Sequence, residues 1–234
     1  MPKHAYEAVL FDMDGVVVDT ERTVAAFWRL LAAEHGFTIS DEELEEHVFG
    51  RHADHTLKVL FPAIPVAEHG PVYERLRVND QTLRYAEIPG ATRLIGELRA
   101  ADVPVALVTG AQDWKATAVL AQLGLAASFD VQIRADDIAV GKPDPGCYRL
   151  AARRLGVDIT RCVIFEDAFS GVAAAVSADG TCVAIGPAVR ASRLTAIGAL
   201  TVVPDLRQTR YEPGRLRVDP LTELPFTQVR ARTP

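Results

Sequence analysis

The sequence predicts an α/β fold, with a parallel sheet, helices on both of its faces and a small inserted α-helical lid. Three observations support this prediction. Short apolar, β-leaning runs alternate with helical segments from residue 88 to residue 206, which is typical of parallel strands joined by crossover helices. Residues 20–88, which precede this alternation, read as almost wholly helical. The chain has 234 residues, enough for one sizeable core and a smaller accessory domain.

The first strand is expected at residues 7–11, EAVLF, because this short apolar run is bounded by an acidic turn, as a central parallel strand would be. The helical insert follows. Residues 22–36 place apolar side chains on one helix face and stop at Gly36. Ser40 begins the next helix, 40–50, as an N-cap followed by acidic first-turn residues. Two more insert helices are expected at 53–61 and at 67–87, the latter starting in earnest after Pro71.

The alternating part of the chain begins with a helix, a turn and the strand VPVALVT within residues 88–110. The later expected strands are 129–133, 162–167, 181–186 and 201–206, and the expected helices between them are 113–123, 145–156 and 168–178. The proline-rich segment after Pro204 reads as extended, surface-lying or partly disordered chain. The expected organisation is a core at 1–17 and 88–210, a helical cap at 18–87 and an extended C-terminal tail at 211–234.

Composition argues against several classes of function. The formal net charge of −6 makes a broad nucleic-acid-binding surface unexpected, although it allows a local basic pocket for a small anion. No stretch has the roughly 18 uninterrupted apolar residues of a membrane helix, and the N-terminus does not resemble a signal peptide. The three cysteines are odd in number and far apart, so we expect buried free thiols in a reducing cytoplasm. A cytoplasmic monomer or weak homodimer without nucleic-acid or membrane partners is the prediction.

Polar residues at the ends of the expected strands carry the functional signal, because ligands bind at the carboxyl ends of the strands in an open α/β sheet. Taken singly, each of them could be a turn residue, a helix cap or a solvated side chain. Two acids at the end of a buried strand, however, cost free energy unless they are paired or bind a metal. Lysine is also rare, with four among 25 basic residues. The candidates are Asp12, Asp14, Thr109, Gly110, Lys142, Glu166 and Asp167.

These residue types predict phosphate chemistry. Asp12, Asp14, Glu166 and Asp167 are hard oxygen ligands without nearby His or Cys, which suits Mg²⁺. The i, i+2 spacing of the first two puts both carboxylates on the same side of an extended chain, where one could attack and the other carry a proton. Attack of a carboxylate on phosphorus would give an acyl phosphate. The threonine hydroxyl, the glycine amide and the lysine could then hold the phosphoryl oxygens.

The segments FDMDGVVVDT, LVTG, GKPDP and VIFEDAFSG resemble, in order and spacing, the four motifs of the haloacid dehalogenase-like hydrolase superfamily over residues 7 to about 186. The resemblance implies a Rossmann-like core with a helical cap. It implies Asp12 as nucleophile and Asp14 as general acid and base that also binds the metal through its backbone carbonyl. It further implies that Thr109 and Lys142 bind phosphate and that Asp167, with Glu166 adjacent, completes the Mg²⁺ site.

Within the superfamily, the chain resembles the subgroup of β-phosphoglucomutase and the small sugar-phosphate phosphatases. The stretch DGVVVDT is similar to the mutase form. The positions of the mutase's cap residues that hold a second phosphate, however, fall on Val24, Val78 and Ala53, although Arg51 is close by. The chain is therefore expected to be a Mg²⁺-dependent phosphatase of a small sugar or polyol phosphate that works through an aspartyl phosphate.

Two alternatives stay open, a phosphomutase and a non-catalytic protein that binds a phosphorylated ligand. The four intact motifs argue against the second. Arg51, His52 and His55 follow Gly50 and are candidates for substrate contact, unless this stretch is a solvated surface loop.

Overall fold

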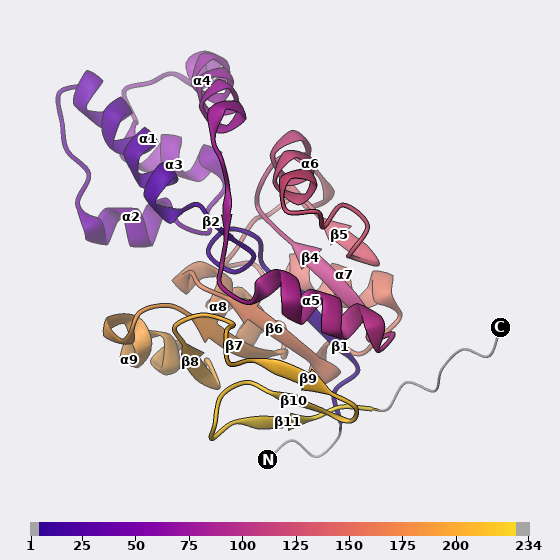
Figure 1. The fold of residues 1–234 in the computed structure, drawn as a ribbon. Coiled ribbons are helices and arrows are strands. Elements are labelled where there is room, and N and C mark those ends of the chain that lie inside the picture. The colour runs from indigo at the N-terminus through magenta and orange to yellow at the C-terminus, as the bar shows by residue number, and fades with distance from the viewer. Residues whose placement is uncertain (1–4, 228–234) are drawn as a thin grey trace.

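A six-stranded parallel sheet forms the centre of the molecule (Figure 1). The computed structural model describes residues 5–227 of the chain. The strands lie in the order β5-β4-β1-β6-β7-β8 and pair in parallel throughout. Their bounds are β1 Ala8–Phe11, β4 Val105–Val108, β5 Val131–Ile133, β6 Cys162–Glu166, β7 Thr181–Ile185 and β8 Thr201–Val203. The predicted fold class is confirmed.

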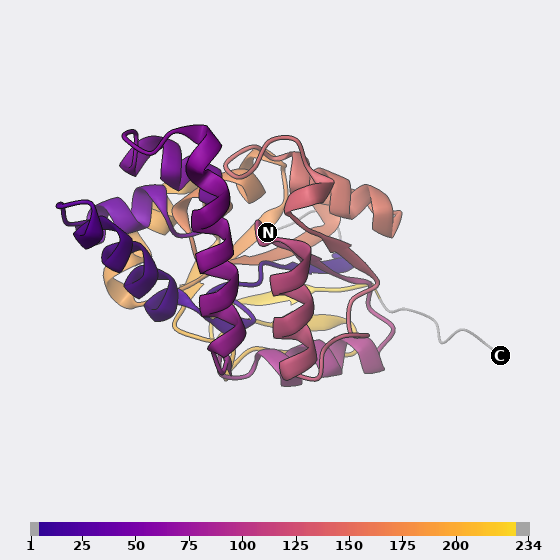
Figure 2. The same ribbon diagram turned by 90° about the horizontal axis from the view of Figure 1, so that it is seen from above.

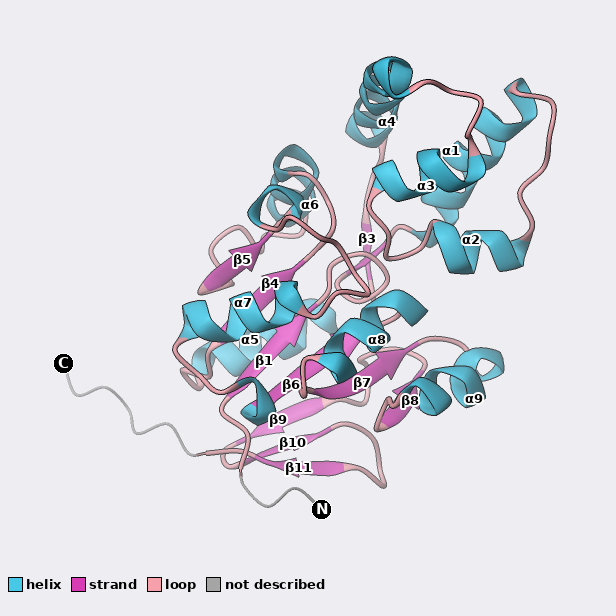
Figure 3. Cartoon of the chain, turned by 180° about the vertical axis from the view of Figure 1, so that it is seen from behind, coloured by secondary structure: helices cyan, strands magenta, loops and turns pink. Residues whose placement is uncertain are grey.

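Helices cover both faces of this sheet (Figure 3). Because side chains alternate along a strand, Val9 and Phe11 of β1 pack on one face while Ala8 and Leu10 pack on the other, and all four are fully buried. The first face carries α5 Ala91–Ala100 and α6 Asp113–Gln122, and the second carries α7 Gly146–Leu155, α8 Phe169–Ser177 and α9 Ala188–Ile197. Helix α9 was not expected from the sequence. Leu194 is its only buried residue, so its sequence does not show the apolar face by which an amphipathic helix is predicted.

The C-terminal segment differs from the surface-lying tail expected over 211–234. Its described part forms an antiparallel sheet of β9 Arg210–Glu212, β10 Arg215–Arg217 and β11 Glu223–Pro225. The buried side chains of Leu216, Leu224 and Phe226 join the core on the α5 face of the central sheet. Side chains alternate between the two faces of a strand, so Leu216 of β10 points into the core while the arginines on either side of it are exposed. Residues 228–234 lie outside the described residues.

Residues between β1 and α5 form a helical body with its own apolar core of Trp28, Leu31, Leu57 and Phe61, among others. Its elements are α1 Glu21–Glu34, α2 Asp41–His47, α3 Ala53–Leu60, a 3₁₀ turn Val66–Glu68 and α4 His69–Thr82. Helix α4 begins before Pro71, which is tolerated in a first helical turn. The entering and leaving chains pair as β2 Val18–Asp19 and β3 Ala86–Glu87. This separate core and its two linkers support the proposed cap at 18–87.

The remaining short elements are 3₁₀ turns at Ala135–Asp137 and Ile159–Arg161. Within residues 5–227, no helix combines the length and the hydrophobicity that crossing a lipid bilayer requires.

Candidate active site

A cavity lies between the cap and the carboxyl ends of the central strands. Its core wall includes Asp12, Asp14, Thr109, Gly110 and Asp167, which are the residues that follow β1, β4 and β6. Strand β1 is the point where the strand order reverses, because the chain runs from β1 to β4 and β5 on one side and returns to β6 on the other. The residues predicted from strand ends therefore meet where open α/β sheets bind ligands.

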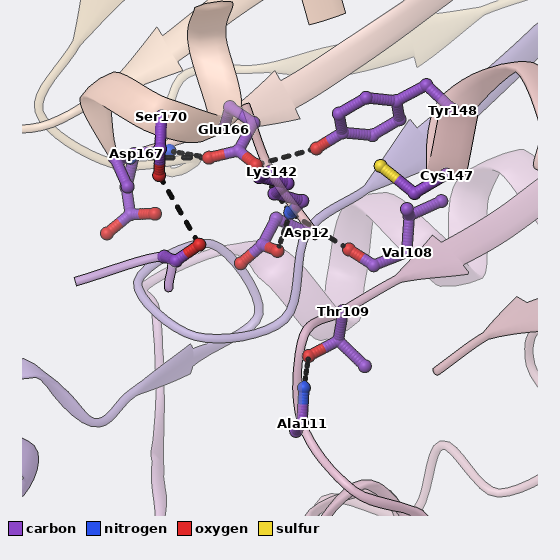
Figure 4. Close-up of polar contacts among 12 residues, drawn as sticks. Asp12, Val108, Thr109, Ala111, Lys142, Cys147, Tyr148, Glu166, Asp167 and Ser170 are labelled. Atoms are coloured by element: carbon purple, nitrogen blue, oxygen red, sulfur yellow. Dashed lines mark hydrogen bonds and ion pairs between the residues drawn. The ribbon is translucent and has the colours of Figure 1, made fainter. Parts of the chain in front are cut away.

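A buried ion-pair network lies behind the cavity wall (Figure 4). The Lys142 ammonium donates to Asp12, to Oε1 of Glu166 at 2.6 Å and to the carbonyl oxygen of Val108 at 3.2 Å. Burial opposes the charge of Lys142, and the carboxylates of Asp12 and Glu166 outweigh this effect and raise its pKa. Lys142 is therefore a permanent cation that links the ends of β1, β4 and β6.

Glu166 is fully buried, and the protein occupies both of its carboxylate oxygens. Oε1 accepts from the hydroxyl of Tyr148 at 2.6 Å and from Lys142, while Oε2 accepts the backbone N–H groups of Asp167 and Ala168 at 2.9 and 3.2 Å. A Cβ at Gly171 would collide with this carboxylate, so the first turn of α8 needs glycine there. Glu166 thus orients Lys142 and the chain that carries Asp167.

Asp14 lies on the cavity wall with two donors on one of its carboxylate oxygens. The Thr20 hydroxyl and the ammonium of Lys115 both donate to Oδ1, the latter at 2.9 Å. Burial opposes the charge of Lys115, but Asp14 and Asp80 raise its pKa above the ordinary value. Sequence reasoning missed Lys115, since a lysine inside a helix is ordinarily a solvated residue. The rarity of lysine in this chain was the available signal.

Three acids form a cluster that fits a metal ion. Asp12, Glu166 and Asp167 each offer a carboxylate oxygen, and these oxygens lie within 4.8 Å of one another. Burial raises the pKa of Asp12 to about 8, Lys142 opposes this shift, and Glu166 and Asp14 add to it. Burial, Glu166 and Asp12 raise the pKa of Asp167 well above its usual range. Hard oxygen donors whose negative charges repel one another are the set that a divalent cation such as Mg²⁺ stabilises.

The Asp14 side chain is not part of this acidic cluster, and its Oδ1 accepts from Thr20 and Lys115 instead. Gly15 lies against the cluster instead. It has a φ of +78°, and a Cβ there would collide with the carboxylate of Asp167. A backbone ligand at Asp14, as the resemblance implies, is compatible with this close approach of the two chain segments.

Thr109 and Gly110 lie on the cavity wall directly after β4. The Thr109 hydroxyl is buried and accepts the N–H of Ala111 at 3.0 Å, which leaves its own hydrogen free to point to another acceptor. Nothing lies within 4 Å of the position that a Cβ on Gly110 would take, so the wall is open at this residue. Both positions can donate to an anion held beside Asp12.

Of the three cap residues predicted to contact substrate, two line the cavity and one does not. Arg51 and His52 line the cavity, whereas His55 is not among its lining residues and its ring nitrogen lies 3.4 Å from that of His47. The Arg51 guanidinium donates to the carbonyl oxygens of Lys142 at 3.1 Å and Glu46 at 3.2 Å. Arg51 therefore also ties the cap to the loop that carries Lys142.

Further contacts hold the cap against the core. Arg190 of α9 pairs with Glu21 of α1 and with Glu45 of α2. The hydroxyl of Ser170 in α8 donates to the carbonyl oxygen of Gly50 at 3.3 Å. Together with the contact of Arg51, these interactions link the cap directly to the core that carries the carboxylates.

Comparison with known proteins gives concordant findings. A family model described as haloacid dehalogenase-like hydrolase matches residues 6–179. The chain is 33% identical over 177 residues to a phosphorylated carbohydrates phosphatase of Thermotoga maritima, covering 74% of this chain and 81% of that protein. It is 30% identical over 190 residues to hexitol phosphatase A of Escherichia coli, covering 80% and 87%. The crystal structure of CbbY from Rhodobacter sphaeroides in complex with phosphate matches with a TM-score of 0.74 and 27% identity, covering 87% and 96%.

Proposed function

We propose that this chain, which belongs to the haloacid dehalogenase-like hydrolases and is a phosphoric monoester hydrolase, acts on a small sugar or polyol phosphate. The proposed reaction proceeds through an aspartyl phosphate. The observation that supports the proposal most is the position of Asp12, which borders the cavity while Lys142 holds its carboxylate from behind. The relatives named as phosphatases of phosphorylated carbohydrates and hexitols support the substrate class.

In the proposed first step, a carboxylate oxygen of Asp12 attacks phosphorus. The bond between phosphorus and the ester oxygen breaks as the aspartyl phosphate forms, and Asp14 gives its proton to the departing alcohol oxygen. In the second step, Asp14 takes a proton from a water molecule that attacks the same phosphorus. The acyl phosphate bond then breaks, which releases phosphate and restores the carboxylate of Asp12.

Several neighbouring groups support these proposed steps. Thr109 and the N–H of Gly110 can donate to the phosphoryl oxygens, and Lys142 offsets their negative charge from behind Asp12. Thr20 and Lys115 hold one oxygen of Asp14 and leave the other for proton transfer. The cap closes over the site, excludes bulk water and contacts the leaving group.

Mg²⁺ is the proposed cofactor, and the carboxylates of Asp12 and Asp167 and the backbone carbonyl of Asp14 would hold it. Glu166 lies adjacent, but the protein already occupies both of its oxygens, so we assign it to orienting Lys142. When bound, the ion would offset the negative charge of the carboxylates and of the phosphoryl group.

A phosphomutase is the second candidate, and the position of Arg51 on the cavity wall favours it, because a mutase must hold a second phosphate. Two observations weigh against it. The guanidinium of Arg51 already donates to two backbone carbonyl oxygens. Val24 and Ala53, the positions expected to carry polar cap groups in a mutase, put apolar side chains on the wall.

A substrate panel tests the proposal. Phosphate release from hexose, hexitol and glycerol phosphates is measured with Mg²⁺ and with EDTA, and the phosphorus NMR spectrum of the products separates hydrolysis from transfer. We expect Mg²⁺-dependent release of inorganic phosphate. An isomerised sugar phosphate without release of phosphate would establish the mutase, and tight binding without turnover across the panel would establish a non-catalytic ligand-binding protein.

A further inference from the structure

Lys115 joins the core to the cap beside the proton carrier. It lies on α6, and its ammonium nitrogen is 2.9 Å from Oδ1 of Asp14 and 3.9 Å from Oδ2 of Asp80 on α4. The side chains of Lys115 and Asp80 are only 13% and 10% exposed, and both residues line the cavity. Figures 1 and 2 show α4 and α6 side by side. The steps proposed above give no role to Asp80 and use Lys115 only as a partner of Asp14.

We propose that Lys115 and Asp80 recognise a hydroxyl group of the leaving alcohol close to its ester oxygen, and thereby make the enzyme selective for polyol and sugar phosphates over alkyl phosphates. This inference rests on the proposed function and assigns the residues that set its substrate class.

The distances favour a bridging hydroxyl over a direct bond. At 3.9 Å the ammonium of Lys115 and the carboxylate of Asp80 are too far apart for a hydrogen bond, which needs about 2.7–3.2 Å. A hydroxyl group whose oxygen lies about 2.8 Å from each atom would fit between them. It would accept a hydrogen bond from Lys115 and donate one to Asp80. The ammonium has three N–H donors and Asp14 takes one, so a donor is left for this hydroxyl.

The position of the pair restricts the hydroxyl to the neighbourhood of the reacting bond. Asp14 must come within about 2.6–3.2 Å of the ester oxygen to protonate it. Because Lys115 bonds the same carboxyl group, the hydroxyl that it recognises belongs on the carbon next to the phosphorylated one, or one carbon further. A primary phosphate of a sugar or polyol carries such a hydroxyl, and an alkyl phosphate does not.

Part of the cap wall near this pair is apolar. Val24 and Phe27 of α1 and Leu76 of α4 line the cavity and can contact only the carbon skeleton of a leaving group. The polar side chains of α4 that line the cavity are Tyr73, Asn79 and Asp80. The Tyr73 hydroxyl already donates to Asp54, so Asn79 and Asp80 remain for polar recognition on this side. A buried carboxylate and ammonium left without their hydroxyl partner disfavour the alkyl ester, which is how a polar site discriminates between substrates.

The test compares substrates of equal carbon number with and without hydroxyl groups. Values of kcat/KM are measured for glycerol 3-phosphate against propyl phosphate and for sorbitol 6-phosphate against hexyl phosphate, with wild type, Lys115→Met and Asp80→Leu. We use the pair of substrates that the wild-type enzyme hydrolyses faster. For this pair we expect kcat/KM to be at least about tenfold higher for the hydroxylated ester than for the alkyl ester. This preference is expected to fall below about threefold in both variants, because each loses one bond to the hydroxyl.

The preference is a ratio, so an overall loss of activity in a variant does not obscure it. Asp80→Ala, which removes the hydrogen-bond acceptor without adding bulk, replaces Asp80→Leu if that variant does not fold. Lys58→Met and Asp136→Leu change exposed residues of the same types away from the cavity and serve as matched controls that keep the wild-type ratio. A wild-type ratio near one, or a ratio unchanged in both cavity variants, would overturn the inference while phosphate release continues. Absence of phosphate release from every ester would instead overturn the proposed function.

Discussion

The ammonium nitrogen of Lys142 lies 2.6 Å from Oε1 of Glu166 and donates at the same time to the carboxylate of Asp12. One cation thus joins acids from the ends of two adjacent strands, β1 and β6, inside the core. A buried charge that loses its partner is costly, so each member of this network depends on the others.

Replacing the charge of Glu166 tests this dependence. In Glu166→Gln the ammonium of Lys142 keeps Asp12 but loses its second carboxylate, and we expect the free energy of unfolding to fall by about 3 kcal/mol. Urea unfolding followed by circular dichroism measures the change. Glu212→Gln, in an exposed pair with Arg215, is the control and should keep the wild-type midpoint. Equal midpoints for the two variants would contradict a structural role for the network.

Metal binding should stabilise the fold through the acidic cluster. We expect Mg²⁺ to raise the unfolding temperature of the wild type, because a ligand that binds only the folded chain stabilises it. Asp167→Asn removes one of the clustered carboxylates and should lose most of this shift. The control is Asp136→Asn, an exposed aspartate outside the cluster, which should keep the shift. If Mg²⁺ shifts both variants alike, the ion binds elsewhere.

The three cysteine thiols should be unreactive in the folded protein. Cys147, Cys162 and Cys182 are buried, and burial raises the pKa of each thiol, that of Cys162 to about 12. Because the thiolate is the reactive form, maleimide labelling at pH 7–8 should require urea. The Cys162 pKa lies above its ordinary value of 9.0, so this thiol favours folding below that pH and its contribution is lost as the pH rises towards 12. Rapid labelling of the native protein, counted by mass spectrometry, would contradict this burial.

The C-terminal sheet should contribute to the stability of the core. Leu216 on β10 is fully buried, so Leu216→Ala should lower the free energy of unfolding by about 3 kcal/mol through lost contacts and a cavity. Leu221→Ala is the matched control, since Leu221 is 97% exposed and its truncation should change the stability by less than about 0.5 kcal/mol. A loose tail would predict the same small effect for both variants in urea unfolding.

The parts of this structure that follow from local sequence were predictable. Strands β1, β4 and β6 are short apolar runs, and parallel pairing brings the polar residues that follow them to one edge of the sheet. Asp12 and Lys142, which are far apart in the chain, could therefore be expected at the same edge of the sheet. The cap helices were also predictable from local signals, such as the N-cap Ser40, which forms a capping box with Glu43.

The parts that depend on the packing of separate elements were not predictable. Lys115 reaches Asp14 only because α6 stands beside the loop after β1, and it meets Asp80 only because the cap brings α4 next to α6. His55 follows His52 closely in sequence, yet its ring lies beside His47. Successive side chains of α3 point in different directions, so Ala53 and Thr56 line the cavity and His55 does not. The burial of the C-terminal strands likewise depends on contacts with α5 and the central sheet, which are far away in the sequence.

Detection of an aspartyl phosphate on Asp12 tests the proposed mechanism most directly. Wild-type enzyme is quenched in acid during turnover of the fastest sugar phosphate of the panel, and its peptides are analysed by mass spectrometry. We predict one added phosphoryl group on the peptide that contains Asp12, and neither this adduct nor phosphate release in Asp12→Asn. Undiminished phosphate release by Asp12→Asn, or a phosphoryl group on another residue during turnover, would contradict the assignment of Asp12 as the nucleophile.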